Sequence, residues 1–269
     1  MQEMRMELAE GCLLATIEDG VGLITFNRPE KHNAISIEMW AGLETVLRGW
    51  ESDNDIRVVV LTGAGDKAFI SGADISQFEK LRGNAEAQQE YDRLTSGGRN
   101  SLAMFPKPII AKILGFCLGG GLAVAMDADL RIAADNAQFG IPAARLGIAY
   151  GFQNIRKLVS LVGPAQARMM LYTGNRIGAT EAMRIGLLNQ VVPNESLSEI
   201  VKDLAKTIAG NAPLSVRASK LIIDQIMRAP GDRDTEAVNR ASIECLNSED
   251  YREGRTAFLE KRAPIFRGR

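Results

Sequence analysis

Histidine is almost absent from this chain, because His32 is the only one in 269 residues. A histidine-rich metal site is therefore excluded, and no metal ligand set is predicted. A Ser-His-Asp triad would have to use His32, and the sequence has no Gly-x-Ser-x-Gly segment that would present a nucleophilic serine. These absences argue against both histidine-dependent metal chemistry and a serine hydrolase.

Cysteine is also scarce. Cys12, Cys117 and Cys245 are odd in number and far apart in the sequence. This spacing fits neither a disulfide framework nor a zinc site, and it favours a reducing, cytoplasmic location.

An excess of either charge is missing, since 32 Lys and Arg residues stand against 33 Asp and Glu residues. A nucleic-acid partner needs a basic surplus, so none is predicted. Residues 1–11 hold three glutamates and do not resemble a secretory signal. The apolar stretch 109–126 contains Lys112 and four glycines, which predicts a buried strand and helix and no membrane partner.

What remains is an ordinary globular composition, with 46% hydrophobic and 24% charged residues. Strand-like and helix-like segments alternate through the first part of the chain, which predicts an α/β core over residues 1–193. Residues 12–17 and 21–26 form the expected hairpin around Asp19-Gly20. Residues 194–269 form a C-terminal helical region, with helices expected at 194–210, 213–228, 235–247 and 251–262.

Two glycine-rich loops stand out. Gly63-Ala64-Gly65-Asp66-Lys67-Ala68 approaches a dinucleotide fingerprint, but residues 69–72 do not continue as a helix, so a nicotinamide enzyme is a weak alternative to a plain turn. Gly119-Gly120-Gly121 begins a predicted helix through Met126. Its exposed N–H groups could bind an oxyanion, and its glycines could equally serve close packing of helix on strand.

Several ordered segments resemble the crotonase (enoyl-CoA hydratase/isomerase) superfamily: residues 27–34, 68–75, 115–121, 139–142, 180–187 and 248–262. The resemblance implies a spiral of ββα units with a C-terminal helical trimerisation region. It implies an acyl-CoA thioester as substrate, no cofactor besides the coenzyme A of that substrate, and a homotrimer or a hexamer made of two trimers. By motif position, the amides of Ala73 and Gly120 would hold the thioester oxygen.

The same resemblance implies a set of residues that contact coenzyme A, and for the last two of them the ligand belongs to this or a neighbouring subunit. The set is Arg28, Lys67, Ala68, Ala73, Asp74, Ile75, Phe258 and Lys261.

The sequence departs from the family's hydratases at two positions. Alanines 123 and 143 stand where those enzymes carry glutamates, which puts standard hydration in doubt. Tyr150 falls where the methylmalonyl-CoA decarboxylase branch has an active-site tyrosine, although that branch has a histidine in place of Ala73. The candidate catalytic residues are thus Ala73, Gly120 and Tyr150, with a packed tyrosine as the alternative for the last. A malonyl-type decarboxylase and a non-catalytic acyl-CoA-binding subunit remain open.

Other polar residues near these motifs have plainer interpretations. Arg145 could meet a substrate carboxylate, but a salt bridge to a structural acid is favoured. Glu90 could supply a base, but a solvated helix face is favoured. Asp127 and Asp129 are expected to cap the preceding helix or to pair with Arg131.

Overall fold

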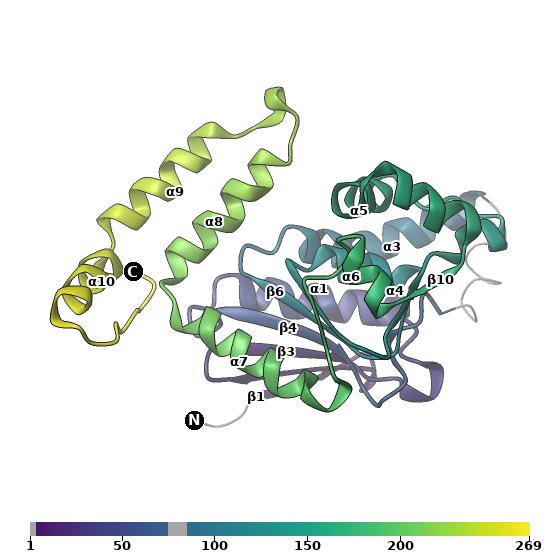
Figure 1. Ribbon diagram of the computed structural model, residues 1–269, viewed down its shortest axis with the longest axis horizontal. Coiled ribbons are helices and arrows are strands. Elements are labelled where there is room, and N and C mark those ends of the chain that lie inside the picture. Colours follow the sequence, from purple (N-terminus) through teal and green to yellow (C-terminus); the bar gives the residue numbers. More distant parts are fainter. Residues whose placement is uncertain (1–3, 75–84) are drawn as a thin grey trace.

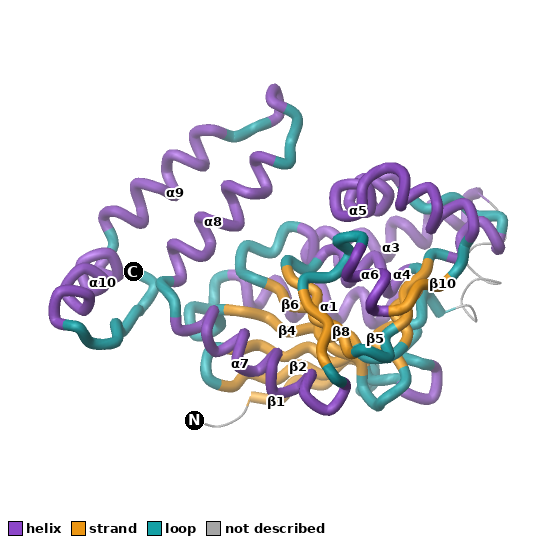
Figure 2. Tube along the Cα trace, viewed as in Figure 1, coloured by secondary structure: helices purple, strands orange, loops and turns teal. Residues whose placement is uncertain are grey.

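The computed structural model describes residues 4–74 and 85–269. Its core holds two sheets with helices packed around them (Figures 1 and 2). The larger sheet has seven strands in the order β1-β2-β3-β4-β6-β8-β11. Their bounds are Met4–Leu8, Leu13–Glu18, Val21–Phe26, Val58–Gly63, Ile109–Ile113, Leu130–Ala134 and Gln190–Val192.

The predicted hairpin is confirmed as β2 and β3, which pair antiparallel around Asp19 and Gly20. Both turn residues have positive φ, 49° for Asp19 and 82° for Gly20, which Asp and Gly tolerate better than other residues. From β3 onward the strands of this sheet are parallel. Parallel pairing requires crossover connections, and these carry the helices of the core.

The smaller sheet has the order β10-β9-β7-β5. Each strand has only three residues: Ala68–Ile70 for β5, Phe116–Leu118 for β7, Gln138–Gly140 for β9 and Arg176–Gly178 for β10. β5, β7 and β9 run parallel, and β10 is antiparallel to β9. The two glycine-rich loops lie at strand ends of this sheet, before β5 and after β7.

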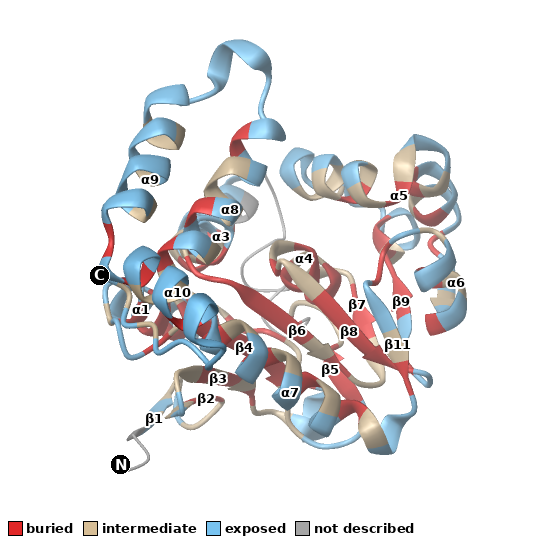
Figure 3. Cartoon of the chain, turned by 60° about the vertical axis from the view of Figure 1, so that its left-hand side comes forward, coloured by how far each residue is buried: buried red, intermediate tan, exposed pale blue. Residues whose placement is uncertain are grey.

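The central strands β4, β6 and β8 of the larger sheet are buried on both faces (Figure 3). Val59 and Leu61 of β4 point into the main core, which also takes in helices α1 (Ile37–Glu51) and α4 (Gly120–Asp127). Val58 and Val60 point the other way, against helix α7 (Leu197–Gly210). The remaining core helices are α3 (Ala85–Ala103), α5 (Phe152–Thr173) and α6 (Ala179–Arg184), with 3-10 turns at Pro29–Lys31, Pro142–Leu146 and Asn194–Ser196.

Beyond α7 the chain leaves the sheets (Figure 1). Helices α8 (Pro213–Ile226), α9 (Thr235–Asn247) and α10 (Glu249–Glu260) form an arm, with a 3-10 turn at Pro230–Asp232. The four predicted C-terminal helices are therefore confirmed to within a few residues. The boundary at residue 193 stays a prediction, and α7, which follows it, packs on the sheet of the core.

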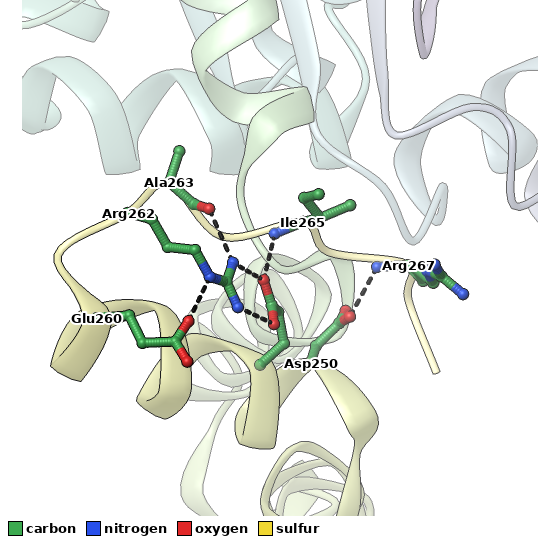
Figure 4. Close-up of polar contacts among 7 residues, drawn as sticks. Asp250, Glu260, Arg262, Ala263, Ile265 and Arg267 are labelled. Atoms are coloured by element: carbon green, nitrogen blue, oxygen red, sulfur yellow. Dashed lines mark hydrogen bonds and ion pairs between the residues drawn. The ribbon is translucent and has the colours of Figure 1, made fainter.

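The last residues fold back on α10 (Figure 4). Arg262 forms ion pairs with Glu253 and Glu260, at 2.6 and 2.7 Å. The Arg267 N–H donates to Asp250, a carboxylate that is only 3% exposed. Arg262 and the backbone N–H of Ile265 hold the pKa of Glu253 down, to about 2. The tail is thereby fixed to the arm.

The α/β fold is as predicted, but several elements escaped prediction. They are β1, β5, β7, β9, β10, β11, α5 and α6. The apolar stretch 109–126, predicted as one buried strand and one helix, is divided among two strands, β6 and β7, and helix α4. Among the described residues, no helix is both long enough and apolar enough to span a membrane.

Candidate active site

Helix α4 begins at the triple glycine, and the structure requires or permits glycine at each of the three positions for a different reason. Gly119 precedes the helix with a φ of +50°, a conformation that favours glycine. A Cβ on Gly121 would lie 2.0 Å from the carbonyl oxygen of Ile70, so this position lets the helix pack directly on β5. A Cβ on Gly120 would meet nothing closer than the Ala73 nitrogen, at 3.4 Å. Close packing therefore explains Gly121 and leaves Gly120 free for another role.

Ala73 follows β5 in a segment held by the early loop. The Ile35 N–H donates to the Gly72 carbonyl at 2.9 Å, and the Asp74 N–H donates to the Ile35 carbonyl at 3.0 Å. These bonds use the groups on either side of Ala73 and form an isolated parallel bridge between Ile35 and Ala73. The Ala73 N–H takes no part in that bridge.

The two amides named by the sequence therefore lie side by side. Among the described residues, neither the Ala73 nor the Gly120 N–H donates to a protein acceptor. Buried amide groups rarely lack a partner, and N–H groups at a helix N-terminus attract negative charge. An adjacent pair of free donors, one of them at the start of a helix, is suited to binding a developing oxyanion.

An ion pair fixes the Ala73 segment to the early loop. The Arg28 guanidinium lies 2.8 Å from the Asp74 carboxylate, and these side chains are only 12% and 7% exposed. Lys31 adds a second cation 3.6 Å from the same carboxylate. Arg28 also donates to the Ala34 carbonyl at 3.0 Å. Two residues expected to contact coenzyme A are thus occupied with each other, and they position Ala73.

Asn33 is a positioning residue that the sequence analysis missed. It is fully buried, and its side-chain amide donates to the carbonyls of Ala64 and Ala68 at 2.9 and 2.7 Å. Its oxygen accepts from the Arg28 N–H at 2.9 Å. The residue has a φ of +57°, which asparagine adopts more readily than most residues. That tolerance of positive φ was the only signal available in the sequence.

Lys67 and Ala68 border a small pocket. Its volume is about 290 Å³, and its lining includes His32, Asp66, Lys67 and Ala68. Lys67 is exposed, whereas Ala68 is buried as the first residue of β5. The loop 64–67 leads directly into β5 and not into a helix, so the dinucleotide fingerprint is excluded here. Ile75 lies outside the described residues.

Phe258 and Lys261 lie on the arm, on and just after α10, and Phe258 is 83% exposed. In Figures 1 and 3, α10 is well separated from α4. Within one chain, these two residues are therefore not brought to the Ala73 and Gly120 amides.

Tyr150 contacts the site through the backbone. Its hydroxyl donates to the carbonyl oxygen of Gly119 at 3.0 Å, across 31 residues of sequence. Burial, with a smaller contribution from Cys117, raises the pKa of this hydroxyl above its usual range. The tyrosine is therefore a protonated hydrogen-bond donor whose acceptor is the peptide that precedes Gly120.

The two alanines that the sequence analysis predicts to replace glutamates differ in exposure. Ala143 is 6% exposed at the start of the 3-10 turn Pro142–Leu146, and Ala123 is half-buried in the first turn of α4. Pro142 lies beside the helix start, with its Cδ 3.9 Å from the Cβ that Gly119 would carry. Neither alanine can supply a proton.

Several plainer expectations need correction. Arg145 hydrogen-bonds Asn175 and the Thr173 carbonyl, and no acid within the part of the chain that the structure describes forms the expected salt bridge with it. Asp127 pairs with Lys157 and Asp129 with Lys220, whereas Arg131 donates to carbonyl groups. These partners lie on α5 and α8, far along the chain, which local pattern could not indicate.

The exposed face expected for Glu90 is confirmed, since Glu90 pairs there with Arg93 and this contact lowers its pKa.

No group of three or more His, Cys, Asp or Glu residues within residues 4–74 and 85–269 is arranged to hold a metal ion. The donors available at the Ala73 and Gly120 amides are N–H groups, which bind anions and not cations.

Comparisons with known proteins identify the family of the chain. The family model described as "Enoyl-CoA hydratase/isomerase" matches residues 16–269. A short-chain-enoyl-CoA hydratase of Clostridium acetobutylicum is 38% identical over 245 residues, covering 91% of this chain and 93% of the relative. A crotonyl-CoA hydratase of Syntrophomonas wolfei is 38% identical over 249 residues, covering 93% and 95%.

Among solved structures, an enoyl-CoA hydratase/carnithine racemase from Magnetospirillum magneticum superposes with a TM-score of 0.92 at 34% identity, covering 97% of both chains. Sequence and fold agree over almost the whole length. The chain therefore belongs to the enoyl-CoA hydratase/isomerase family, within the crotonase superfamily.

Proposed function

We propose that this protein binds an acyl-CoA thioester and stabilises its enolate between the backbone N–H groups of Ala73 and Gly120. The observation that carries the proposal is the adjacency of these two unpaired amides, with the Ala73 nitrogen 3.4 Å from the position of a Gly120 Cβ. The N-terminal end of α4 adds positive potential at the same place.

The energetic argument favours this use of the site. Chemistry next to a thioester carbonyl places negative charge on the carbonyl oxygen. A preorganised donor aimed at that charge contributes about 3 kcal/mol, and backbone donors held by a helix and a strand need no reorganisation. The Arg28–Asp74 ion pair and the bridge to Ile35 supply that rigidity for Ala73.

The reaction is proposed to differ from standard two-glutamate hydration. The two bacterial relatives described above, from Clostridium acetobutylicum and Syntrophomonas wolfei, are named as hydratases. In this chain Ala123 and Ala143 stand where the resemblance places the two acid–base glutamates. A positioned general acid or base contributes about 10²- to 10⁴-fold, so their replacement by alanine lowers ordinary hydration strongly. Enolate stabilisation needs neither carboxylate.

Decarboxylation of a malonyl-type CoA is the second candidate. Breaking the bond to the carboxylate releases carbon dioxide and leaves its electron pair on the enolate, so no base has to remove a proton from carbon. Because this step needs no carboxylate base, it is compatible with alanine at positions 123 and 143 beside the proposed oxyanion hole. A non-catalytic acyl-CoA-binding subunit is the outcome if no reaction is found.

Self-association is part of the proposal. The arm carries exposed apolar side chains that nothing in one chain covers among the described residues: Ile223, Ile226, Met227, Ile243, Leu246, Phe258 and Leu259. Exposed apolar surface of this extent is typical of a protein interface. Assembly as a homotrimer or a hexamer would bury it, and would allow Phe258 and Lys261 to reach the coenzyme A of a neighbouring subunit.

The experiment is incubation of the purified protein with a panel of acyl-CoA thioesters, including crotonyl-CoA and methylmalonyl-CoA, with products identified by mass. Loss of carbon dioxide supports the decarboxylase. Gain of water means that hydration proceeds without the two glutamates. An unchanged panel combined with tight acyl-CoA binding supports a binding subunit, and absence of binding overturns the proposal.

A further inference from the structure

Tyr150 donates to the one carbonyl oxygen that shares a peptide bond with the Gly120 nitrogen. The hydroxyl lies 3.0 Å from the Gly119 oxygen, and the Gly119 carbonyl and the Gly120 N–H belong to a single peptide unit. In a trans peptide these two groups point in opposite directions, so a donor on the oxygen leaves the N–H unobstructed.

One further hydrogen bond fixes the same peptide, and another fixes the Leu118–Gly119 peptide before it. The Ala123 N–H donates to the Gly119 oxygen at 3.1 Å, and the Gly119 N–H donates to the Gly140 oxygen at 2.9 Å. Ala123 lies within α4 and Gly140 within β9. The first bond is part of the regular helix, whereas the tyrosine bond is an addition from a distant part of the chain.

Hydrogen bonds in a chain polarise one another. A donor on a peptide oxygen draws electron density from the nitrogen and makes the N–H a stronger donor, by about 10–30% per bond. The effect is largest where the peptide lies away from water, and Tyr150 is partly buried against the main core.

We propose that Tyr150 is a positioning residue for the oxyanion hole, which orients the Gly119–Gly120 peptide and strengthens the Gly120 N–H as a donor to the thioester oxygen. This inference rests on the proposed function of that amide. It differs from the role of a proton-transfer group, because the hydroxyl proton is already engaged with the Gly119 oxygen. A phenylalanine at this position would keep the ring packing and lose only the hydrogen bond.

The test measures the enolate of acetoacetyl-CoA, a β-keto thioester whose enolate is recognised by its near-ultraviolet absorbance. The wild type is expected to shift the bound ligand toward the enolate. Loss of one hydrogen bond in Tyr150→Phe is expected to reduce this enolate affinity about two- to tenfold. The matched control is Tyr172→Phe, which removes a hydroxyl from a 75% exposed tyrosine of α5 and is expected to change nothing.

A double-mutant cycle separates the indirect role from a direct one. Gly120→Pro removes the N–H through which Tyr150 is proposed to act. In that background Tyr150→Phe is expected to cause no further loss. An equal loss in both backgrounds, a loss of about 100-fold or more in the single variant, or no loss at all would overturn the inference.

A measurement without ligand tests the inference even if the proline variant does not fold or the protein does not stabilise an enolate. In protein labelled with ¹⁵N-glycine, Tyr150→Phe is expected to shift the Gly120 amide resonance and to leave that of Gly49 in place. Gly49 lies on the exposed side of α1, with nothing within 4 Å of its Cβ position. An unmoved Gly120 resonance overturns the inference. A moved resonance in a wild type that stabilises no enolate overturns the proposed function alone.

Discussion

Arg28 and Asp74 form a nearly buried ion pair, with 2.8 Å between guanidinium and carboxylate, immediately beyond Ala73. The pair connects the early loop to the segment that carries one of the two candidate oxyanion donors. This structural role explains why two charged residues lie next to the candidate site, although the donors of the site itself are uncharged backbone amides.

Removal of the arginine is predicted to destabilise the fold. Arg28→Met takes the guanidinium away from a carboxylate that is 7% exposed, so the free energy of unfolding should fall by about 3 kcal/mol. The matched control is Arg48→Met, which breaks an ion pair of the same 2.8 Å length whose arginine is 69% exposed. That change should be below about 0.5 kcal/mol. Urea unfolding measures both, and equal effects would contradict the positioning role of the buried pair.

Glycine at position 121 is predicted to be essential for the contact between α4 and β5. A Cβ there would lie 2.0 Å from the Ile70 oxygen, so Gly121→Ala should push the helix away and reduce stability by about 2 kcal/mol. Gly49→Ala is the control, because it adds a methyl group where nothing lies within 4 Å. That variant should gain up to about 1 kcal/mol from helix propensity. Thermal unfolding distinguishes these opposite signs, and stabilisation by both would refute the close contact.

Stability is predicted to rise between pH 8 and pH 9. Burial lowers the pKa of Lys107 and of Lys157 to about 8 from the ordinary 10.5. The folded state then binds fewer protons than the unfolded state in this interval, so the free energy of unfolding increases with pH, by about 1 kcal/mol for each lysine. Above pH 9 the raised pKa of the buried Cys117 thiol acts in the opposite direction.

The variant that tests this pH dependence is Lys107→Met. Lys107 is 4% exposed and donates to the carbonyls of Trp50 and Asp53. The variant should be less stable overall, because two carbonyl groups lose a donor. Its free energy of unfolding should also increase less between pH 8 and pH 9, because the contribution of Lys107 is missing. The exposed Lys206 serves as control, and Lys206→Met should retain the full rise. A rise that persists in Lys107→Met would show that this lysine is not its source.

Placing glutamates at positions 123 and 143 is predicted to introduce hydration. The double variant Ala123→Glu, Ala143→Glu should add water to crotonyl-CoA at least about 100-fold faster than the wild type, since each group contributes 10²- to 10⁴-fold in such reactions. Ala144→Glu is the control, placed on an exposed neighbour in the same turn. Absorbance of the enoyl thioester follows the reaction. No gain in a folded double variant would mean that the acyl group does not lie between these positions.

Elements with a strong local signal could be predicted from the sequence. Asp19-Gly20 marks the β2–β3 turn, and the glycines before α4 mark both a left-handed residue and a close contact. Helix α5 was missed because Gly163, with a φ of +74°, and Pro164 interrupt it. The strands β5, β9, β10 and β11 have three residues each, too few for any periodicity to appear.

The two backbone donors of the candidate site were proposed from the sequence, but the side chains that hydrogen-bond the segments around them were not identified as doing so. Asn33 reaches carbonyl groups 31 and 35 residues away, and Tyr150 reaches Gly119 across 31 residues. Such contacts depend on the tertiary fold and leave no local pattern. The same reason accounts for Asp129, which pairs with Lys220 of α8 and not with the nearby Arg131.

The central claim is that the Gly120 N–H stabilises a thioester enolate, and Gly120→Pro tests it most directly. Proline at the first residue of a helix is tolerated, and it replaces the N–H donor with a ring carbon. Thr235→Pro, at the exposed first residue of α9, is the matched control for the substitution itself. The measurement is the enolate affinity for acetoacetyl-CoA of the wild type and the two folded variants. We predict a loss of about 100-fold or more in Gly120→Pro and none in Thr235→Pro. Enolate binding by Gly120→Pro as strong as that of the wild type would contradict the account.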